Sequence, residues 1–432
     1  MPRNLFIVLF SLLALTAHSL SVTKSPDQST TLSERWQWAQ QHLTKKDVWV
    51  AYSIEQSMPE NELVGSFYGG RERFPTIYEV LTGNKRAFQP NMKTTSDIQI
   101  TGTGHMKLEG RGNIVSREIA MLFGYRGNNM DNVEVSMIDL QFDFRHRDLI
   151  WLGNVSQEES IKFLQGVYKK EAGGKLAEDL LDAIGIHHRP ALVTPILQEV
   201  LNSRTKDDLR AKAAFWLGNE NDPDALKILV SALKNEKSED VIEEGLAGLS
   251  EMTLPEGYQQ LKEWTKPSYS QTLREHAIFW MGQKEAPGTL EYLEKIAMED
   301  TNEEILEKAI FSMSEMHETP GVTQTLIRIA RTHPSREGRK QAIFWLSQNY
   351  TEKIEETLKD FASNDKDREI QKQAIFALSE LDNGAGVPEL IQLAKTHKDP
   401  AIRKQAIFWL GESDDERAHQ ALLKIIEEDG DK

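Results

Sequence analysis

The sequence predicts a mainly α protein, an α-solenoid of about eight helix pairs preceded by a small, mostly-β (α+β) domain. Three observations support this prediction. An apolar string recurs every 32 or 33 residues through the second half of the chain. A second apolar group follows each copy of the string at a fixed distance. Before residue 156 the apolar residues instead alternate with a period of two, which is typical of strands.

The recurring string is clearest at Gln405–Gly411, which reads Gln-Ala-Ile-Phe-Trp-Leu-Gly, and Gln341–Ser347 and His276–Gly282 are nearly identical to it. The phenylalanine position serves as a marker for every copy. The marker positions are Ala183, Phe215, Ala247, Phe279, Phe311, Phe344, Phe376 and Phe408. A fixed period of this length indicates stacked units, each of which buries its apolar side against its neighbour.

Each unit is predicted to be a helix, a short turn and a second helix. Leucines follow the markers by 14 residues, or 15 in one unit, at Leu197, Leu229, Leu261, Leu293, Leu326, Leu358, Leu390 and Leu422. Around them apolar residues recur at i, i+3 and i+4, as on one side of an amphipathic helix. Gly218, Gly282 and Gly411 end the first helices at positions suited to a C-cap. The predicted solenoid covers residues 174–428.

A second period is two units long. Trp216, Trp280, Trp345 and Trp409 alternate with the small residues Gly248, Ser312 and Ala377. The interpretation we favour is packing, in which each large ring fills the space beside a small residue. The alternative is a row of exposed indoles for an extended ligand, with rungs roughly 18–20 Å apart.

The string Asp399–Ala406, followed by Leu410-Gly411, resembles the HEAT-like repeat family in the short form also found in phycobilisome-lyase-type proteins. The arginine of this string recurs at Arg210, Arg274, Arg339 and Arg403. The resemblance implies the fold and says little about chemistry. Deoxyhypusine hydroxylases use several His-Glu pairs on such repeats, but only His317-Glu318 has that order here. A β domain followed by HEAT-like repeats also looks similar to exported bacterial proteins.

Residues 1–19 are predicted to be a secretory signal peptide. Arg3 precedes the apolar run Leu5–Leu15, and Ala17–Ser19 offers small residues for cleavage, so that the mature chain would begin at Leu20. We therefore expect a periplasmic or secreted protein without a membrane span after signal cleavage, although an uncleaved anchor is an alternative. The absence of cysteine excludes disulfides and thiolate sites. Phycobilin lyases work in the cytoplasm, which an export signal contradicts.

Residues 20–30 are predicted to be a flexible lead-in and residues 31–155 to be the small, mostly-β domain. Thr31 and Glu34 have the spacing of a capping box. Strand patterns cover residues 48–52, 119–123 and 133–144, the last with a β-bulge at Met137-Ile138. Residues 57–116 are expected to hold loops with one or two strands. Residues 156–173 should form a capping helix that begins with Ser156 and Glu159.

Charge is divided unevenly along the chain. Residues 1–150 hold 16 acidic and 16 basic side chains, which leaves 51 acidic and 35 basic residues for 151–432. The whole net charge of −16 therefore lies in the linker and the repeats, which argues against nucleic acid as a partner. A basic protein would be favoured, and the plainer explanation is solubility of an exposed stack.

A search for chemistry finds no catalytic, cofactor-binding or metal-ligating set. His187-His188 is interpreted as a solvated turn rather than a metal site. Glu134, Asp139 and Asp143 could share a strand face as paired carboxylates, with a solvated face as the plainer interpretation. The loop with Gly102, Gly104, Gly110 and Gly112 lacks the Gly-Lys-Ser/Thr of a phosphate-binding loop.

The predicted function is a non-catalytic, exported scaffold that binds another protein in the cell envelope through its acidic repeats. The candidate contact positions are polar residues of the second helices, expected on the concave side, with solvated faces as the plainer alternative: Glu291, Glu294, Glu356, Lys359, Glu389 and Gln392. The alternative function is a hydrolase or ligand-binding β domain for which the repeats are a docking arm.

Overall fold

The computed structural model describes residues 20–43, 47–60, 62–67, 74–85, 102–107, 113–171, 173–316, 319–348 and 352–430. The chain divides into two compact units. The first comprises Met1–Val200 with Arg204–Leu209, and the second comprises Leu201–Ser203 with Arg210–Lys432. The predicted signal peptide, His317-Glu318, Gly110 and Gly112 lie outside the described residues.

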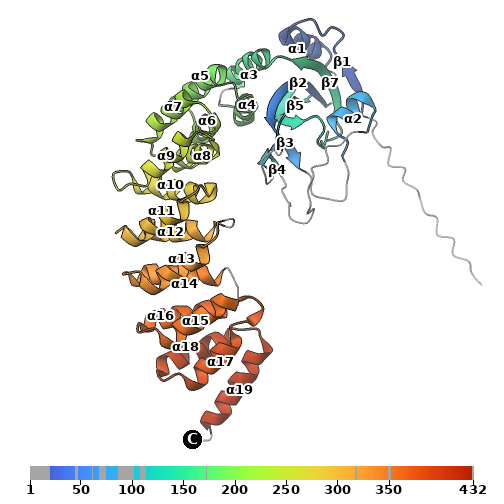
Figure 1. The fold of residues 1–432 in the computed structure, drawn as a ribbon. Helices are drawn as coiled ribbons and strands as arrows, with labels where there is room; N and C mark the ends of the chain where they lie inside the picture. The colour runs from blue at the N-terminus through green and yellow to red at the C-terminus, as the bar shows by residue number, and fades with distance from the viewer. Residues whose placement is uncertain are drawn as a thin grey trace, which may run out of the picture. The chain divides into compact units, whose positions relative to one another are not determined.

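The first unit is built on a mixed five-stranded sheet with the strand order β1-β7-β2-β5-β6 (Figure 1). β7 runs parallel to both β1 and β2, whereas β5 is antiparallel to β2 and β6. A separate antiparallel pair joins β3 and β4. The strands are β1 Val22–Lys24, β2 Val48–Pro59, β3 Glu62–Phe67, β4 Gly102–Lys107, β5 Ile114–Arg126, β6 Asn129–Met137 and β7 Asp148–Val155.

Two short helices of the first unit begin with capping boxes, at Thr31 for α1 (Leu32–Gln41) and at Thr76 for α2 (Ile77–Thr82). The first of these was predicted. One apolar core gathers Trp49, Ala51 and Leu122 of the sheet with Ile77 of α2. These side chains are fully buried, and β2 is buried at every position from Val48 to Ile54, so both of its faces are covered there.

The strands differ from the prediction at two places. The expected lead-in contributes β1, whose Val22 pairs with Leu149, so it is part of the sheet. The predicted strand 133–144 ends at Met137, and the register shift of β6 lies beside Gly124/Tyr125 instead. Beyond Met137 the chain turns, and Phe142 and Phe144 are buried in the core. Their alternating apolar pattern reflects that burial and not a strand.

Three helices complete the first unit: α3 (Gln157–Glu171), α4 (Ala177–Gly185) and α5 (Pro190–Leu201, apart from its last residue). The hydroxyl of Ser156 accepts a bond from the Glu159 backbone N–H at 3.2 Å, which is half of the predicted capping box. The Glu159 carboxylate instead accepts from the Leu32 N–H and so ties α3 to the start of α1. α3 also packs against α4 and β2.

The helices that follow form successive pairs (Figure 1). The first helices are α6 (Asp207–Asn219), α8 (Glu239–Glu251), α10 (Gln271–Lys284), α12 (Glu303–Ser314), α14 (Arg336–Ser347), α16 (Arg368–Ser379) and α18 (Pro400–Gly411). The second helices are α7 (Pro223–Leu233), α9 (Pro255–Trp264), α11 (Thr289–Glu299), α13 (Val322–Thr332), α15 (Glu352–Asn364), α17 (Val387–Thr396) and α19 (Glu416–Gly430), and a 3₁₀ turn, Asp382–Gly384, precedes α17.

The predicted repeat of helix, turn and helix is confirmed. Ala183 lies in α4 and Leu197 in α5, which take the places of a first and a second helix. Every later marker residue lies in a first helix, and every later predicted leucine lies in a second helix. Those leucines are buried except for Leu422, which is partly buried. Among the described residues, no helix is long and apolar enough to cross a membrane.

Candidate functional site

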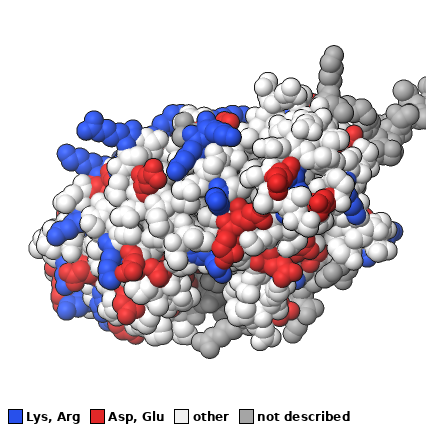
Figure 2. Space-filling view, turned by 90° about the horizontal axis from the view of Figure 1, so that it is seen from above, with Lys and Arg blue, Asp and Glu red and all other residues white. Residues whose placement is uncertain are grey.

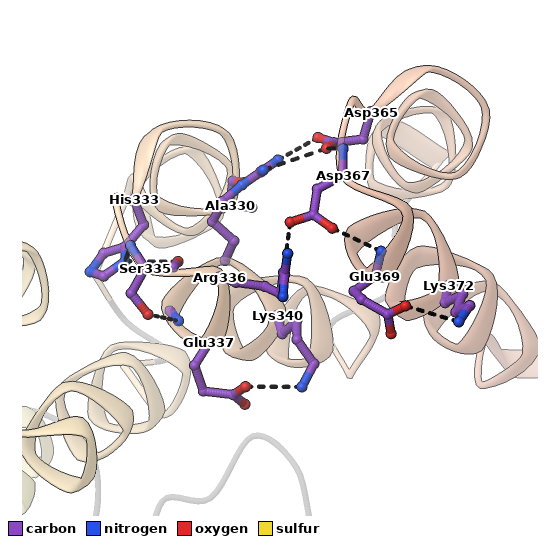
Figure 3. Close-up of polar contacts among 12 residues, drawn as sticks. Ala330, His333, Ser335, Arg336, Glu337, Lys340, Asp365, Asp367, Glu369 and Lys372 are labelled. Atoms are coloured by element: carbon purple, nitrogen blue, oxygen red, sulfur yellow. Dashed lines mark hydrogen bonds and ion pairs between the residues drawn. The ribbon is translucent and has the colours of Figure 1, made fainter.

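An arginine of the first helix joins three segments in alternate units of the second compact unit. Arg274 donates from Nε to the Thr265 carbonyl at 2.9 Å and pairs with Asp300. Arg339 repeats this with the Ala330 carbonyl at 2.8 Å and Asp365 (Figure 3). Arg210 does the same with the Leu201 carbonyl at 3.2 Å and Glu236. We refer to these three sets as the arginine clamps.

The arginine clamps tie the end of one second helix to the end of the next. Each acceptor carbonyl lies 9 residues before its arginine, and each carboxylate lies 26 residues after it. The intervening units have Ile242, Leu306 and Gln371 at the arginine position. The clamping arginine therefore recurs in every second unit, as the tryptophans do. The Arg274 side chain is almost buried, and Asp300 compensates its positive charge there.

Further polar contacts surround the clamp of Arg339, between α13 and α14 and toward the neighbouring pairs. His333 accepts the Ser335 N–H at Nδ1, 3.0 Å away, and its Nε2 lies 2.8 Å from the Ala297 carbonyl of an earlier pair. Nδ1 is thus the acceptor, and Nε2 carries the proton that it donates. Arg336 pairs with Asp367 at 2.6 Å, and Glu337 with Lys340 at 2.9 Å (Figure 3).

The six predicted contact residues differ in their availability. Glu291, Glu356 and Gln392 are exposed. Glu389 is instead 4% exposed and pairs with Lys359 at 2.6 Å. Glu294 is mostly covered and pairs with Arg328 at 2.5 Å and 2.6 Å. For Glu389 and Glu294 the expectation of a freely accessible carboxylate was wrong, because each pairs with a basic residue of a neighbouring second helix, Lys359 of the preceding one and Arg328 of the next.

Ion pairs of this kind neutralise individual acidic side chains of the second helices and leave the net charge unchanged. Glu294–Arg328, Arg331–Asp360 and Lys359–Glu389 each join two successive second helices. On the face shown in Figure 2, acidic and basic side chains both appear, and the acidic ones do not form one continuous patch. Glu291 and Glu356 are the two carboxylates of the predicted set that stay exposed without a partner among the described residues.

The aromatic side chains of the first helices touch from unit to unit. Phe279 stacks on Phe311 with ring centroids 6.1 Å apart, and Phe344 stacks on Phe376 at 6.4 Å. Trp345 packs on Phe311 of the preceding unit with ring centroids 4.9 Å apart, and Trp409 packs on Phe376 of its preceding unit at 5.0 Å. These contacts connect the phenylalanine pairs. We call this continuous set, from Phe279 to Phe408, the aromatic row.

The aromatic row supports the packing interpretation of the tryptophans. Trp216 is buried, and Trp345 and Trp409 are partly buried against the apolar core. Phenylalanines fill the gaps that separate the tryptophans, so the indoles are not isolated rungs of an exposed ladder. Small residues beside them allow close helix contact, since a Cβ on Gly248 would lie 2.0 Å from the Phe215 carbonyl oxygen.

His187 differs from the solvated turn that we predicted, because it is completely buried. Its Nε2 lies 2.8 Å from the Ser160 hydroxyl, which lies 2.9 Å from the Tyr52 hydroxyl. Its Nδ1 lies 3.2 Å from the Ile184 carbonyl. Burial lowers the pKa of His187 to about 4 and keeps the ring neutral. The three side chains join β2, α3 and the end of α4, a role that sequence spacing alone did not reveal.

The three carboxylates of the β domain have different partners rather than one another. Glu134 is buried and pairs with Arg145 at 2.8 Å, while Asp139 lies 3.9 Å from Arg117. Asp143 accepts the Arg145 backbone N–H at 2.8 Å. The expectation of a solvated face was therefore wrong for Glu134. Gly102 and Gly104 lie in β4 and pair with β3, so they belong to a strand rather than a phosphate-binding loop.

Glu220, at the end of α6, is a buried carboxylate that sequence reasoning missed. It is 1% exposed, and its Oε1 has no hydrogen-bond partner among the described residues. Burial, with a smaller effect of Asp222, raises its pKa to about 8. In the intervening units the same repeat position holds the buried apolar residues Met252, Met316 and Leu381. The other units with a tryptophan have the polar residues Lys284, Asn349 and Ser413 there, so the sequence carries no signal that singles out Glu220.

Metal chemistry has no assembled site in the part of the chain that the structure describes. No group of three or more His, Asp or Glu side chains there is arranged to hold a metal ion. The arrangement of the described polar side chains instead holds repeat units together through clamps and ion pairs, and leaves a polar second-helix face exposed.

Comparison with known proteins identifies part of the repeat region. Residues 355–432 match the family model of HEAT repeats. These residues form HEAT repeats. None of the curated proteins matches the sequence.

Several solved structures have similar folds at low sequence identity. Human deoxyhypusine hydroxylase in complex with glycerol is 14% identical, with 59% of this chain and 96% of that chain covered and a TM-score of 0.27. The Escherichia coli protein YibA is 17% identical, with the same two coverages and a TM-score of 0.32. A chain of the Kap95p–RanGDP complex is 12% identical, with 61% of this chain and 44% of that chain covered and a TM-score of 0.38.

Proposed function

We propose that this protein is a non-catalytic scaffold that binds a basic protein partner through the exposed acidic face of its second helices. HEAT repeats over residues 355–432 support a protein partner, because stacked helix pairs expose long continuous surfaces. The observation on which the proposal depends is the charge distribution, in which the whole net charge of −16 falls within residues 151–432. Such a field attracts a basic partner and speeds its association.

The proposed location is the periplasm or the extracellular space. The apolar run Leu5–Leu15 after Arg3, followed by small residues up to Ser19, supports export and cleavage before Leu20. Fractionation of the cells tests the location, and N-terminal sequencing of the purified protein tests the cleavage. A protein that begins at Met1 and stays in the cytoplasm would exclude this part of the proposal.

Capture from an envelope extract tests the partner. We expect the tagged protein to retain a basic protein at low salt and to release it at high salt, because exposed charges are screened within about 10 Å at 0.1 M. The variant Glu291→Lys/Glu356→Lys should retain less of it, because both carboxylates are exposed on second helices.

A matched control separates this face from net charge alone. Glu55→Lys/Glu60→Lys makes the same change in charge at exposed residues of the first unit, and capture should be unchanged. Equal losses in both variants would show that the second-helix face is not the binding surface. Absence of any stoichiometric partner would contradict the scaffold itself.

A further inference from the structure

The last described helix pair has an apolar surface that no other described part of the chain covers. Phe408 of α18 is 53% exposed, and Leu423 and Ile426 of α19 are 63% and 68% exposed. These three are most of the large apolar side chains that are exposed among the described residues, with Ile114 and Leu192 elsewhere. Three such residues on neighbouring helices indicate an interaction surface rather than scattered exposure.

This surface corresponds to the one that each earlier first helix uses to receive the next. Phe279 and Phe344 stack on the phenylalanine of the following pair, whereas the ring contact of Phe408 is with Trp409 of its own helix. A Cβ on Gly282 would lie 2.9 Å from the Ser312 carbonyl oxygen, but a Cβ on Gly411 would meet nothing within 4 Å. α18 therefore has the same surface with which an earlier first helix contacts the next one, but no described helix packs on it.

Ile426 enlarges the apolar surface of this end. It takes the repeat position of the buried alanines Ala297, Ala330, Ala362 and Ala394, and of the buried leucines Leu201 and Leu233. All six are covered, whereas Ile426 is 68% exposed. A large apolar side chain at this position is therefore buried where a further helix packs on it.

The charges on α18 specify how a helix fits this surface. Lys404, Phe408 and Glu412 are all exposed at i, i+4 and i+8, so they follow one side of the helix. Lys340 and Lys372, at the position of Lys404, pair with a glutamate one turn before them. At that place α18 has Ala401, and neither Lys404 nor Glu412 has a charged partner among the described residues.

We propose that two copies of this chain associate through this end, with α18 antiparallel to α18 of the second copy and centred on Phe408. Lys404 and Glu412 each lie about 6 Å along the axis from Phe408, at about 1.5 Å per residue. Antiparallel pairing therefore places each Lys404 opposite the Glu412 of the other copy, as a two-fold interface requires. The two Phe408 rings continue the stacking of the aromatic row, and Leu423 and Ile426 extend the apolar contact. This association does not depend on the proposed basic partner.

Sedimentation equilibrium of the purified full chain tests the proposal. We expect a concentration-dependent dimer, and a dissociation constant at least about tenfold higher for Phe408→Ser, Lys404→Glu or Glu412→Lys alone. Each single charge reversal places like charges opposite each other. The double variant K404E/E412K restores opposite charges across the interface, so its dissociation constant should return to within about threefold of the original.

The double variant also protects the test against loss of folding, because recovery of the dimer requires a folded chain. The matched control is K295E/E299K on α11, which swaps an exposed pair 3.8 Å apart and should leave the dimer unchanged. A chain that stays monomeric at about 100 µM overturns the proposal. So does a dimer that K404E/E412K weakens as much as either single reversal.

Discussion

The hydroxyl of Ser160 lies between the Tyr52 hydroxyl and His187 Nε2, and all three groups are buried. Because His187 Nδ1 faces the Ile184 carbonyl, it carries the ring proton. Ser160 therefore donates to Nε2 and accepts from Tyr52. A single small side chain thus satisfies two larger ones, and it joins three elements of the first unit.

Ser160→Ala should destabilise the first unit by about 2–4 kcal/mol, because it leaves two buried polar groups without a partner. Tyr52→Phe should cost only about 1 kcal/mol, since Ser160 keeps its bond to His187. Denaturant unfolding of both variants, followed by Trp49 fluorescence, measures the difference. Equal losses would show that the hydroxyl of Ser160 does not hold both partners.

Arg274 of the arginine clamps provides a second prediction at this scale. Arg274→Ala should cost about 3–5 kcal/mol, because it leaves the mostly buried Asp300 without a cation. Arg328→Ala is the control, since the Arg328 side chain is 54% exposed and such a pair contributes at most about 1 kcal/mol. Thermal unfolding of the two variants compares them, and a similar loss in both would contradict the importance of burial.

Two first helices of the second unit, α6 and α8, contact each other at glycines. A Cβ on Gly218 would lie 2.5 Å from the Leu249 backbone nitrogen, and one on Gly248 would lie 2.0 Å from the Phe215 oxygen. Both contacts involve backbone atoms, which cannot rotate away as a side chain could. α6 and α8 therefore approach each other at a distance that only glycine allows.

Gly248→Ala should lower the unfolding temperature of the second unit, because α8 must move away from α6 to accept the methyl group. Gly166→Ala in α3 is the matched control, with nothing within 4 Å of the new Cβ. There the exchange should stabilise the helix by about 0.5–1 kcal/mol. A neutral Gly248→Ala would show that the two helices are not held at this distance.

Across the whole molecule, the two units should respond to pH in opposite ways. His187 has a lowered pKa, so the unfolded first unit takes up its proton first, and stability falls as pH drops from about 6.5 toward 4. Glu220 has a raised pKa of about 8, so the unfolded second unit loses its proton first. Stability there falls as pH rises from about 4.5 to 8, by at most about 1.4 kcal/mol per pH unit.

Hydrogen exchange at several pH values measures the two units separately. Glu220→Met should remove the alkaline loss from the second unit and leave the first unit unchanged. Methionine is the side chain that Met252 and Met316 supply at the same repeat position, where both are buried. A second unit that keeps its alkaline loss in this variant would show that another group titrates.

The repeat region was predictable because its periodicity reflects direct packing. The marker residue and the leucine at fixed spacing are buried or half-buried in every unit except the last, where Phe408 is exposed, so the sequence shows the helices and their order. The strands were less regular. Phe142 and Phe144 alternate as strand residues do, yet they follow the end of β6 and fill the core from a turn.

By itself, the sequence determined the tandem helix pairs, the capping box at Thr31 and the concentration of acidic charge in the repeats, because each is a local property of spacing or composition. Only the tertiary structure decided which charges are free, since Glu389 and Glu294 are neutralised by neighbouring second helices. It also decided that His187 is buried, because its partners Ser160 and Tyr52 are distant in sequence. Burial and pairing depend on neighbours brought together by folding, and a one-dimensional pattern does not contain them.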